Sequence, residues 1–155
     1  MHSPDREMAR TAIENLLFLY AERIDAGNFA GVGELFARGR ILAPNGDVIG
    51  TGADEVRAIY ERSTRRYEDG TPMTQHQTTN VILHFEPDGC SARTRARFAV
   101  MQALPGFPLQ CIITGDYEDR FALDESDGWY FVERCMKPRL VGDLSRHLKI
   151  DLPSD

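Results

Sequence analysis

The spacing of apolar residues changes once along this chain, close to residue 75. Before that point apolar side chains recur three or four positions apart, which is typical of helices that bury one face. This pattern predicts a first helix that begins at Ser3-Pro4 and ends at Gly27, and its apolar stripe consists of Ile13, Leu16, Leu17, Tyr20 and Ile24. Two shorter helices are predicted to follow, one capped by Asn28 and one capped by Thr51.

After residue 75 apolar and polar residues alternate with a period of two, which is typical of strands. Turn-forming residues such as Pro87-Asp88-Gly89 divide this part of the chain. They separate four predicted strands, at about 75–86, 91–103, 109–122 and 128–137. A small hairpin with Asn45-Gly46 as its turn is predicted between the second and third helices. Helices first and antiparallel strands afterwards predict an α+β fold, in which the helices cover one face of a curved sheet.

The composition is that of an ordinary globular domain and argues against two classes of partner. Hydrophobic residues make up 42% of the 155 residues and charged residues 27%, so residues 1–155 are expected to form a single domain. The net charge of −6 argues against nucleic acid, because nucleic-acid-binding proteins concentrate positive charge. The longest apolar run, residues 16–21, is too short to span a bilayer, so no membrane partner is predicted.

The cysteines and the first ten residues favour a reducing compartment. Cys90, Cys111 and Cys135 are odd in number and form no C-x-x-C motif, which argues against a zinc site or a redox pair. Residues 1–10 carry charges but lack the apolar core of a signal peptide. We therefore expect free thiols and a cytoplasmic location.

Two residues are unusual for their predicted positions. Asp25 lies in the last turn of the first helix, where the negative end of the helix dipole disfavours a carboxylate. It is either a turn residue ahead of Gly27 or a residue with a tertiary partner. His76 opens the first long strand, and strict alternation places Thr78 and Asn80 on its face. Such a face suits a pocket wall with a few polar groups, although a surface histidine at a sheet edge is the alternative.

No metal site is predicted from the histidines. His76 and His84 are predicted to share a strand face, but eight strand residues span about 26 Å. His2 and His147 are expected to be exposed near the chain ends, the second within a helical turn at about 142–148. The sequence also lacks a G-x-S-x-G nucleophile motif and a glycine-rich phosphate-binding loop.

The order of several short motifs resembles the SnoaL-like branch of the nuclear transport factor 2-like superfamily. The resemblance covers about residues 8–148. The motifs are Tyr20-Ala21-Glu22-Arg23-Ile24-Asp25-Ala26-Gly27-Asn28-Phe29, Leu35-Phe36, His76 with Asn80, Gly128-Trp129-Tyr130-Phe131 with Arg134, and Gly142-Asp143-Leu144-Ser145-Arg146-His147-Leu148. This branch has a cone-shaped, cystatin-like fold and includes scytalone dehydratase and hexachlorocyclohexane dehydrochlorinase.

The resemblance implies a catalytic Asp25–His76 pair, without cofactor or metal, in a pocket between the sheet and the first helices. The expected activity is that of a lyase or isomerase, similar to a dehydratase, on a small hydrophobic cyclic molecule. His76 would be the general base and Asp25 would orient its ring. Tyr20, Asn80 and Phe98 are the expected substrate-binding residues.

Two departures from the family pattern argue against a reaction of the scytalone type. The second histidine of scytalone dehydratase corresponds to Val100 or Met101 here, and the tyrosine before its aspartate corresponds to Ile24. The alternative is a binding protein or accessory subunit without catalysis, as in the small subunits of ring-hydroxylating dioxygenases. The resemblance further implies a homo-oligomer, either a dimer or a trimer. The alternating Arg93, Arg95 and Arg97 mark a strand face that is either solvated or a subunit interface.

Overall fold

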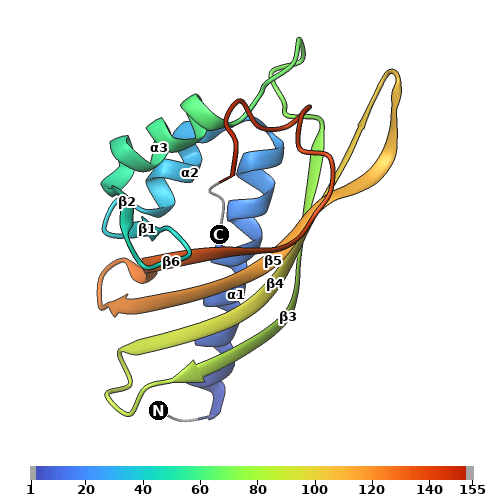
Figure 1. The fold of residues 1–155 in the computed structure, drawn as a ribbon. Helices are drawn as coiled ribbons and strands as arrows, with labels where there is room; N and C mark the ends of the chain where they lie inside the picture. Colours follow the sequence, from blue (N-terminus) through green and yellow to red (C-terminus); the bar gives the residue numbers. More distant parts are fainter. Residues whose placement is uncertain (1–2, 153–155) are drawn as a thin grey trace.

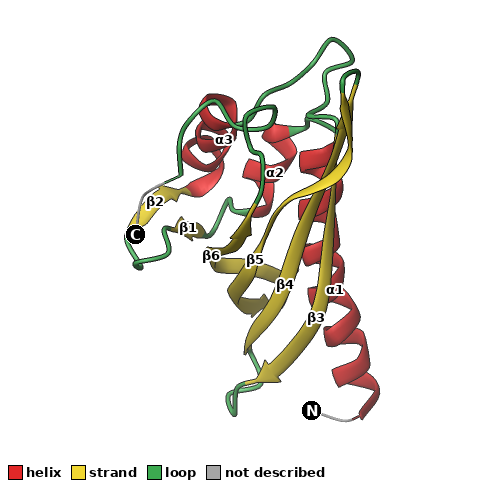
Figure 2. Ribbon diagram, turned by 45° about the vertical axis from the view of Figure 1, so that its right-hand side comes forward, coloured by secondary structure: helices red, strands yellow, loops and turns green. Residues whose placement is uncertain are grey.

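Three helices lie on one face of a six-stranded sheet in the computed structural model, which describes residues 3–152 (Figure 1). The helices are α1 (Ser3–Asp25), α2 (Phe29–Leu35) and α3 (Gly52–Ser63). The strands are β1 (Arg40–Leu42), β2 (Val48–Thr51), β3 (Thr74–Phe85), β4 (Ser91–Leu104), β5 (Phe107–Asp124) and β6 (Gly128–Val141). Figure 2 shows the long strands curving around α1. The predicted α+β class is therefore confirmed.

The sheet has the order β2-β1-β6-β5-β4-β3, so the early hairpin joins the edge beside the last strand. Neighbouring strands run antiparallel except β1 and β6, which are parallel. The four long strands appear at the predicted places, but β5 and β6 are longer than predicted. A tight turn at Pro105-Gly106 replaces most of the predicted loop between β4 and β5, and β6 continues to Val141 beside β5.

The two predicted helix caps have different outcomes. The Asn28 side chain accepts a hydrogen bond from the Gly31 amide at 2.9 Å, as the sequence predicted. Thr51 is the N-cap residue of α3, as predicted, but its side chain makes no hydrogen bond to the helix. Instead the Glu55 carboxylate reaches back and accepts from the Thr51 amide at 2.8 Å, because this amide would otherwise lack a partner at the helix start.

A β-bulge in β3 changes which side chains face the helices. The pairing with β4 shifts between Thr79 and Ile82, and Asn80 has a φ of 55°. Thr74, His76 and Thr78 are the partly buried side chains before the bulge, whereas Val81, Leu83 and Phe85 are those after it. The expectation that Asn80 shares the face of His76 is therefore wrong. His84 is exposed as well, so it does not share that face either.

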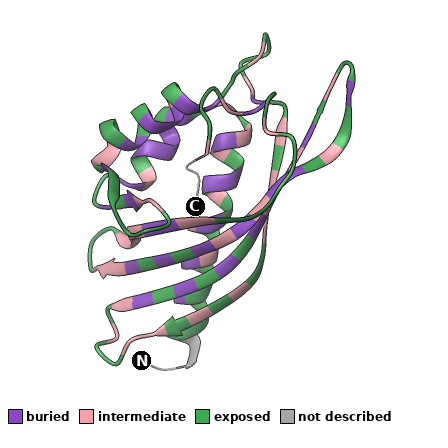
Figure 3. Cartoon of the chain, viewed as in Figure 1, coloured by how far each residue is buried: buried purple, intermediate pink, exposed green. Residues whose placement is uncertain are grey.

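The core lies between the inner face of the sheet and the helices, as the buried positions in Figure 3 show. At one end it is filled by aromatic rings: Phe36 stacks on Phe131 with centroids 4.7 Å apart, and Phe121 packs against Phe131 in a tilted arrangement at 4.8 Å. Toward the ends of α1 and α3 the side chains leave a cavity. None of the helices described in residues 3–152 has the length and apolar character of a membrane span.

Candidate functional site

Asp25 and His76 form the polar centre of the candidate site. Asp25 is the last residue of α1 and lies opposite the beginning of β3. Its Oδ1 is 2.6 Å from His76 Nδ1, and its Oδ2 accepts a hydrogen bond from the His76 amide at 2.7 Å. The Thr74 hydroxyl donates to Oδ1 at 2.9 Å. Asp25 thus has the tertiary partners that its position at a helix C-terminus requires.

This bonding defines the chemistry available to the imidazole. The Asp25 carboxylate accepts, so His76 Nδ1 carries the proton of this bond and Nε2 is left with its lone pair. The His76 side chain is only 8% exposed, and it lines a cavity of about 370 Å³. Asp25 is not among the residues that line this cavity. The carboxylate therefore lies behind the ring, and the ring lies between the carboxylate and the cavity.

The cavity has mostly apolar walls. Tyr20 and Ile24 of α1, Ile59 of α3, and Phe98 and Val100 of β4 contribute to it. Its volume is in the range of small-molecule sites, and an apolar lining with few polar groups is typical of them. Tyr20 and Phe98, both predicted from sequence as substrate-binding residues, therefore line the same cavity as His76.

Gly115 determines how closely Phe98 packs. The two residues are paired across β4 and β5, and a Cβ on Gly115 would lie 2.5 Å from the Phe98 ring. Glycine leaves the ring free to stack on Tyr117 of β5, with centroids 4.5 Å apart. The cavity wall at this point is a pair of stacked aromatic rings.

Two phenols extend the polar part of the site. The hydroxyls of Tyr20 and Tyr60 are 2.5 Å apart, and the Tyr20 hydroxyl also donates to Met136 Sδ at 3.4 Å. Burial raises the pKa of Tyr60 well above its usual value, and it raises the pKa of Tyr20 as well. Both phenols therefore keep their protons near neutral pH and are hydrogen-bond donors. The sequence indicated Tyr20 but not Tyr60, whose spacing from Val56 and Ile59 is that of an ordinary apolar helix face.

A sealed ion pair lies beneath the tyrosines. Arg134 Nε and Nη2 each donate to the Asp119 carboxylate at 2.8 Å, and neither side chain is exposed. The guanidinium carbon is 3.7 Å from the Tyr117 ring centroid and 4.2 Å from that of Tyr20. Burial disfavours the charge on Arg134, but the Asp119 carboxylate outweighs this and raises the pKa of the guanidinium.

The sequence prediction missed this pair although a signal was present. Asp119 alternates in register with Tyr117 and Phe121, both of which are buried. A carboxylate at such a position requires a buried partner. The partner, Arg134, comes from the neighbouring strand and lies directly opposite in the register.

His147 is a second histidine in the site, and its predicted exposure is wrong. The predicted helical turn forms, since the amides of His147 and Leu148 donate to the Leu144 carbonyl at 3.0 and 2.9 Å. This turn returns the chain to the cavity, which both His147 and His76 line. His147 is 7% exposed, and the two imidazole centroids are 6.1 Å apart. The sequence showed the turn but not the direction in which it folds.

Asn80 lies outside this arrangement. Its side chain is exposed because the bulge turns it away from the helices, and it does not line the cavity. Of the other predicted site residues, His76, Tyr20 and Phe98 line the cavity, and Asp25 contacts the His76 ring without lining the cavity. Among residues 3–152 there is no group of three His, Cys, Asp or Glu side chains arranged to hold a metal ion.

The chain matches a protein family in sequence and several solved structures in fold. A family model described as the SnoaL-like domain matches residues 6–135. LinA superposes with a TM-score of 0.72 and 16% identity over 100% of both chains. A protein of Novosphingobium aromaticivorans provisionally assigned as a scytalone dehydratase has a TM-score of 0.71 and 19% identity, over 92% of this chain and 91% of that chain.

A structure from another functional class has the same fold. The beta subunit of a provisionally assigned aromatic-ring-hydroxylating dioxygenase, also from Novosphingobium aromaticivorans, has a TM-score of 0.66 and 14% identity. The match covers 88% of this chain and 92% of the subunit. No curated protein matches the sequence significantly. At these identities the solved structures establish the fold and leave the activity to the chemistry of the site.

Proposed function

Because the chain belongs to the SnoaL-like domain family, we propose that it is a cofactor-independent lyase or isomerase of the dehydratase type. Its substrate is a small hydrophobic cyclic molecule. The observation that carries this proposal is the Asp25–His76 contact of 2.6 Å at the wall of an apolar cavity. Two structures with the same fold, LinA and the provisionally assigned scytalone dehydratase, support the choice of a lyase.

In the proposed reaction His76 Nε2 is the general base. It takes a proton from a substrate carbon, and the Asp25 carboxylate stabilises the imidazolium that forms. The electron pair of the broken C–H bond becomes the new double bond, and a leaving group departs from the adjacent carbon. In an isomerisation the proton returns from Nε2 to another carbon of the same substrate.

The remaining cavity residues bind and orient the substrate in this proposal. Burial keeps Tyr20 and Tyr60 protonated. Tyr20 provides a phenolic donor for a substrate oxygen when it exchanges its bond to Met136 Sδ for one to the substrate, while Tyr60 donates to Tyr20. The stacked rings of Phe98 and Tyr117 provide a flat apolar wall against which a cyclic molecule can pack. The apolar lining excludes water and thereby strengthens the hydrogen bonds made inside.

The first test is a turnover assay with a panel of aromatic and terpenoid ketones and alcohols. We expect His76→Ala to abolish turnover of any substrate found. Asp25→Asn should reduce it by up to about 10⁴-fold, because an amide cannot stabilise the imidazolium. His84→Ala, on the exposed side of the same strand, is the matched control and should retain full activity. A folded Asp25→Asn protein with full activity would contradict the mechanism.

The alternative proposal is a ligand-binding or accessory subunit without catalysis. It is favoured by the fold shared with the dioxygenase beta subunit. In that case the Asp25–His76 contact is structural, and Asp25→Asn should lower the free energy of unfolding by about 1–3 kcal/mol. Ligand binding by the folded fraction should survive, so activity and melting temperature measured on the same preparation separate the two functions.

We also propose a homo-oligomer that assembles through the outer face of the sheet. This face carries exposed charged side chains in rows across three strands, including Arg93, Arg95, Glu118 and Arg120. Positive and negative side chains are mixed on this face, so a positive side chain of one copy can lie against a negative side chain of another. Light scattering at tens of micromolar should give the mass of a dimer or trimer, and a monomer would contradict the proposal.

A cytoplasmic location is proposed because the cysteines are unpaired.

A further inference from the structure

His147 reaches the candidate site from a part of the chain that the Asp25–His76 pair does not involve. It lies after β6, and its ring faces that of His76 at an interplanar angle of 62°. Neither ring nitrogen of His147 has a hydrogen-bond partner among residues 3–152, and Nδ1 is fully enclosed. An imidazole more than nine-tenths buried without a partner is unusual, because buried polar groups are normally hydrogen-bonded.

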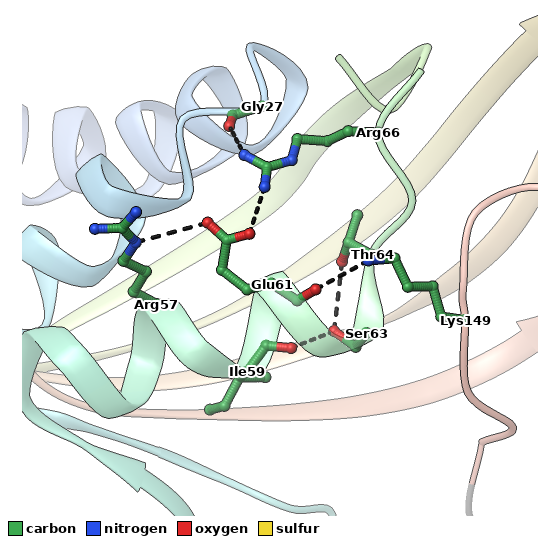
Figure 4. A network of polar contacts seen from close by, with 8 residues as sticks. All are labelled: Gly27, Arg57, Ile59, Glu61, Ser63, Thr64, Arg66 and Lys149. Carbon is green, nitrogen blue, oxygen red and sulfur yellow. Dashed lines mark hydrogen bonds and ion pairs between the residues drawn. The ribbon is translucent and has the colours of Figure 1, made fainter. Parts of the chain in front are cut away.

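The backbone around His147 is firmly attached to the end of α3. The Arg65 amide donates to the His147 carbonyl at 2.8 Å, and Thr64 forms an isolated bridge with Leu148. The Lys149 amide donates to the Ser63 carbonyl at 2.8 Å. Figure 4 shows the Lys149 side chain reaching the Glu61 carbonyl, at 3.0 Å, beside Ser63 and Thr64.

A second attachment comes from the sheet. The Gln102 amide nitrogen donates to the carbonyls of Arg146 and Pro72, each at 3.1 Å. The Tyr67 hydroxyl donates to the same Arg146 carbonyl. The residue before His147 is thus bonded from β4 and from the loop after α3, so the position of the ring is set by both layers of the fold.

The ring is also in a defined charge state. Burial lowers the pKa of His147 to about 4, with the neighbouring His76 acting in the same direction and Asp25 opposing it. The imidazole is therefore neutral near pH 7, with one N–H donor and one acceptor nitrogen. A neutral imidazole in an apolar cavity binds an oxygen of a ligand without introducing a charge.

We propose that His147 is a second substrate-contacting residue, which hydrogen-bonds a substrate oxygen while His76 faces a substrate carbon. This inference rests on the proposed function and adds the class of substrate: a cyclic molecule with a hydroxyl or carbonyl group. The 6.1 Å between the ring centroids leaves the two contacts within the reach of one small molecule. The oxygen bonds Nε2, because Nδ1 is fully enclosed by the protein and a ligand cannot reach it.

The test compares two probes of almost the same shape, 1-naphthol and naphthalene, by calorimetric or fluorescence titration. One hydrogen bond is worth about 0.5–1.5 kcal/mol, which corresponds to roughly two- to tenfold in affinity. We expect the wild-type protein to bind 1-naphthol at least about twofold more tightly than naphthalene. His147→Phe should reduce this preference by roughly two- to tenfold, while its affinity for naphthalene stays within about twofold. His84→Phe is the control for an exposed histidine and should change neither affinity.

A His147→Phe protein that keeps the full wild-type preference for 1-naphthol overturns the role of His147 and leaves the Asp25–His76 site intact. No preference in the wild-type protein also overturns it. Unchanged naphthalene binding shows that the variant has kept its cavity. The proposed function fails by a different observation, full turnover by Asp25→Asn, so the two failures are distinguishable.

Discussion

Two carboxylates on the inner side of the fold each bind a basic side chain, and the two pairs differ in how accessible they are. Asp25 bonds His76 at 2.6 Å, and Asp119 bonds Arg134 at 2.8 Å. The side chains of the first pair are 20% and 8% exposed, whereas those of the second are both fully enclosed. The first pair ends in a free ring nitrogen at the cavity. The second is covered by the rings of tyrosines and cannot meet a ligand.

The difference teaches what distinguishes a reactive pair from a structural one in the same sheet. Asp119 raises the pKa of Arg134, so the guanidinium stays protonated and cannot act as an acid or a base near neutral pH. His76 instead keeps Nδ1 bonded to Asp25 and has Nε2 without a bond at the cavity, where it can accept a proton from a ligand. Chemistry at the cavity therefore depends on the Asp25–His76 pair, and the packing of Tyr20 and Tyr117 depends on the sealed Asp119–Arg134 pair.

Breaking the sealed pair should have the largest effect on stability. Arg134→Met leaves the Asp119 carboxylate buried without a partner, and we expect the free energy of unfolding to fall by about 3–5 kcal/mol. Urea denaturation followed by circular dichroism measures this. The double variant with Asp119→Leu should recover part of the loss, since both charges are then removed.

The matched control for this prediction is the exposed pair of Lys137 and Glu118, which are 2.8 Å apart on the outer face. Glu118→Ala should leave the unfolding curve almost unchanged, because solvent screens such pairs. An Arg134→Met protein as stable as this control would show that the buried pair has no structural role.

The second prediction concerns the loss of stability at low pH. The unfolded chain takes up a proton on His147 near pH 6.5, whereas the folded protein does so only near pH 4. Stability should therefore fall as the pH is lowered through this window, by up to about 3 kcal/mol from this residue. His147→Phe should flatten the dependence of the melting temperature on pH, and His84→Phe should not. Parallel curves for wild type and His147→Phe would contradict the assignment.

The smallest expected effect on stability concerns the support of the Asp25–His76 pair by Thr74. Thr74→Val keeps the volume but removes the 2.9 Å hydrogen bond to Asp25. We expect a loss of about 0.5–1.5 kcal/mol in the free energy of unfolding and a smaller loss of activity than for Asp25→Asn. Thr79→Val, at an exposed position of the same strand, is the control. Equal stability of the two variants would show that Thr74 does not hold the carboxylate.

Much of the fold was predictable because helices and strands have local signatures. The stripe from Ile13 to Ile24 and the alternation after residue 75 depend only on neighbours a few positions away. Asp25 and His76 were recognisable as unusual for the same reason, since a carboxylate at a helix C-terminus and a polar group on a strand face are local features. Asn80 was misplaced because strict alternation cannot show a bulge.

The sequence by itself thus determined the order of the elements, the α+β class and the two residues at the centre of the candidate site. The tertiary structure alone decided the bulge at Asn80, the pairing of Asp119 with Arg134, and the return of His147 to the cavity. The physical reason is range: local periodicity follows from backbone geometry, whereas each of these three features depends on a partner strand or a distant helix end. A turn shows where the chain bends, but packing decides what it faces.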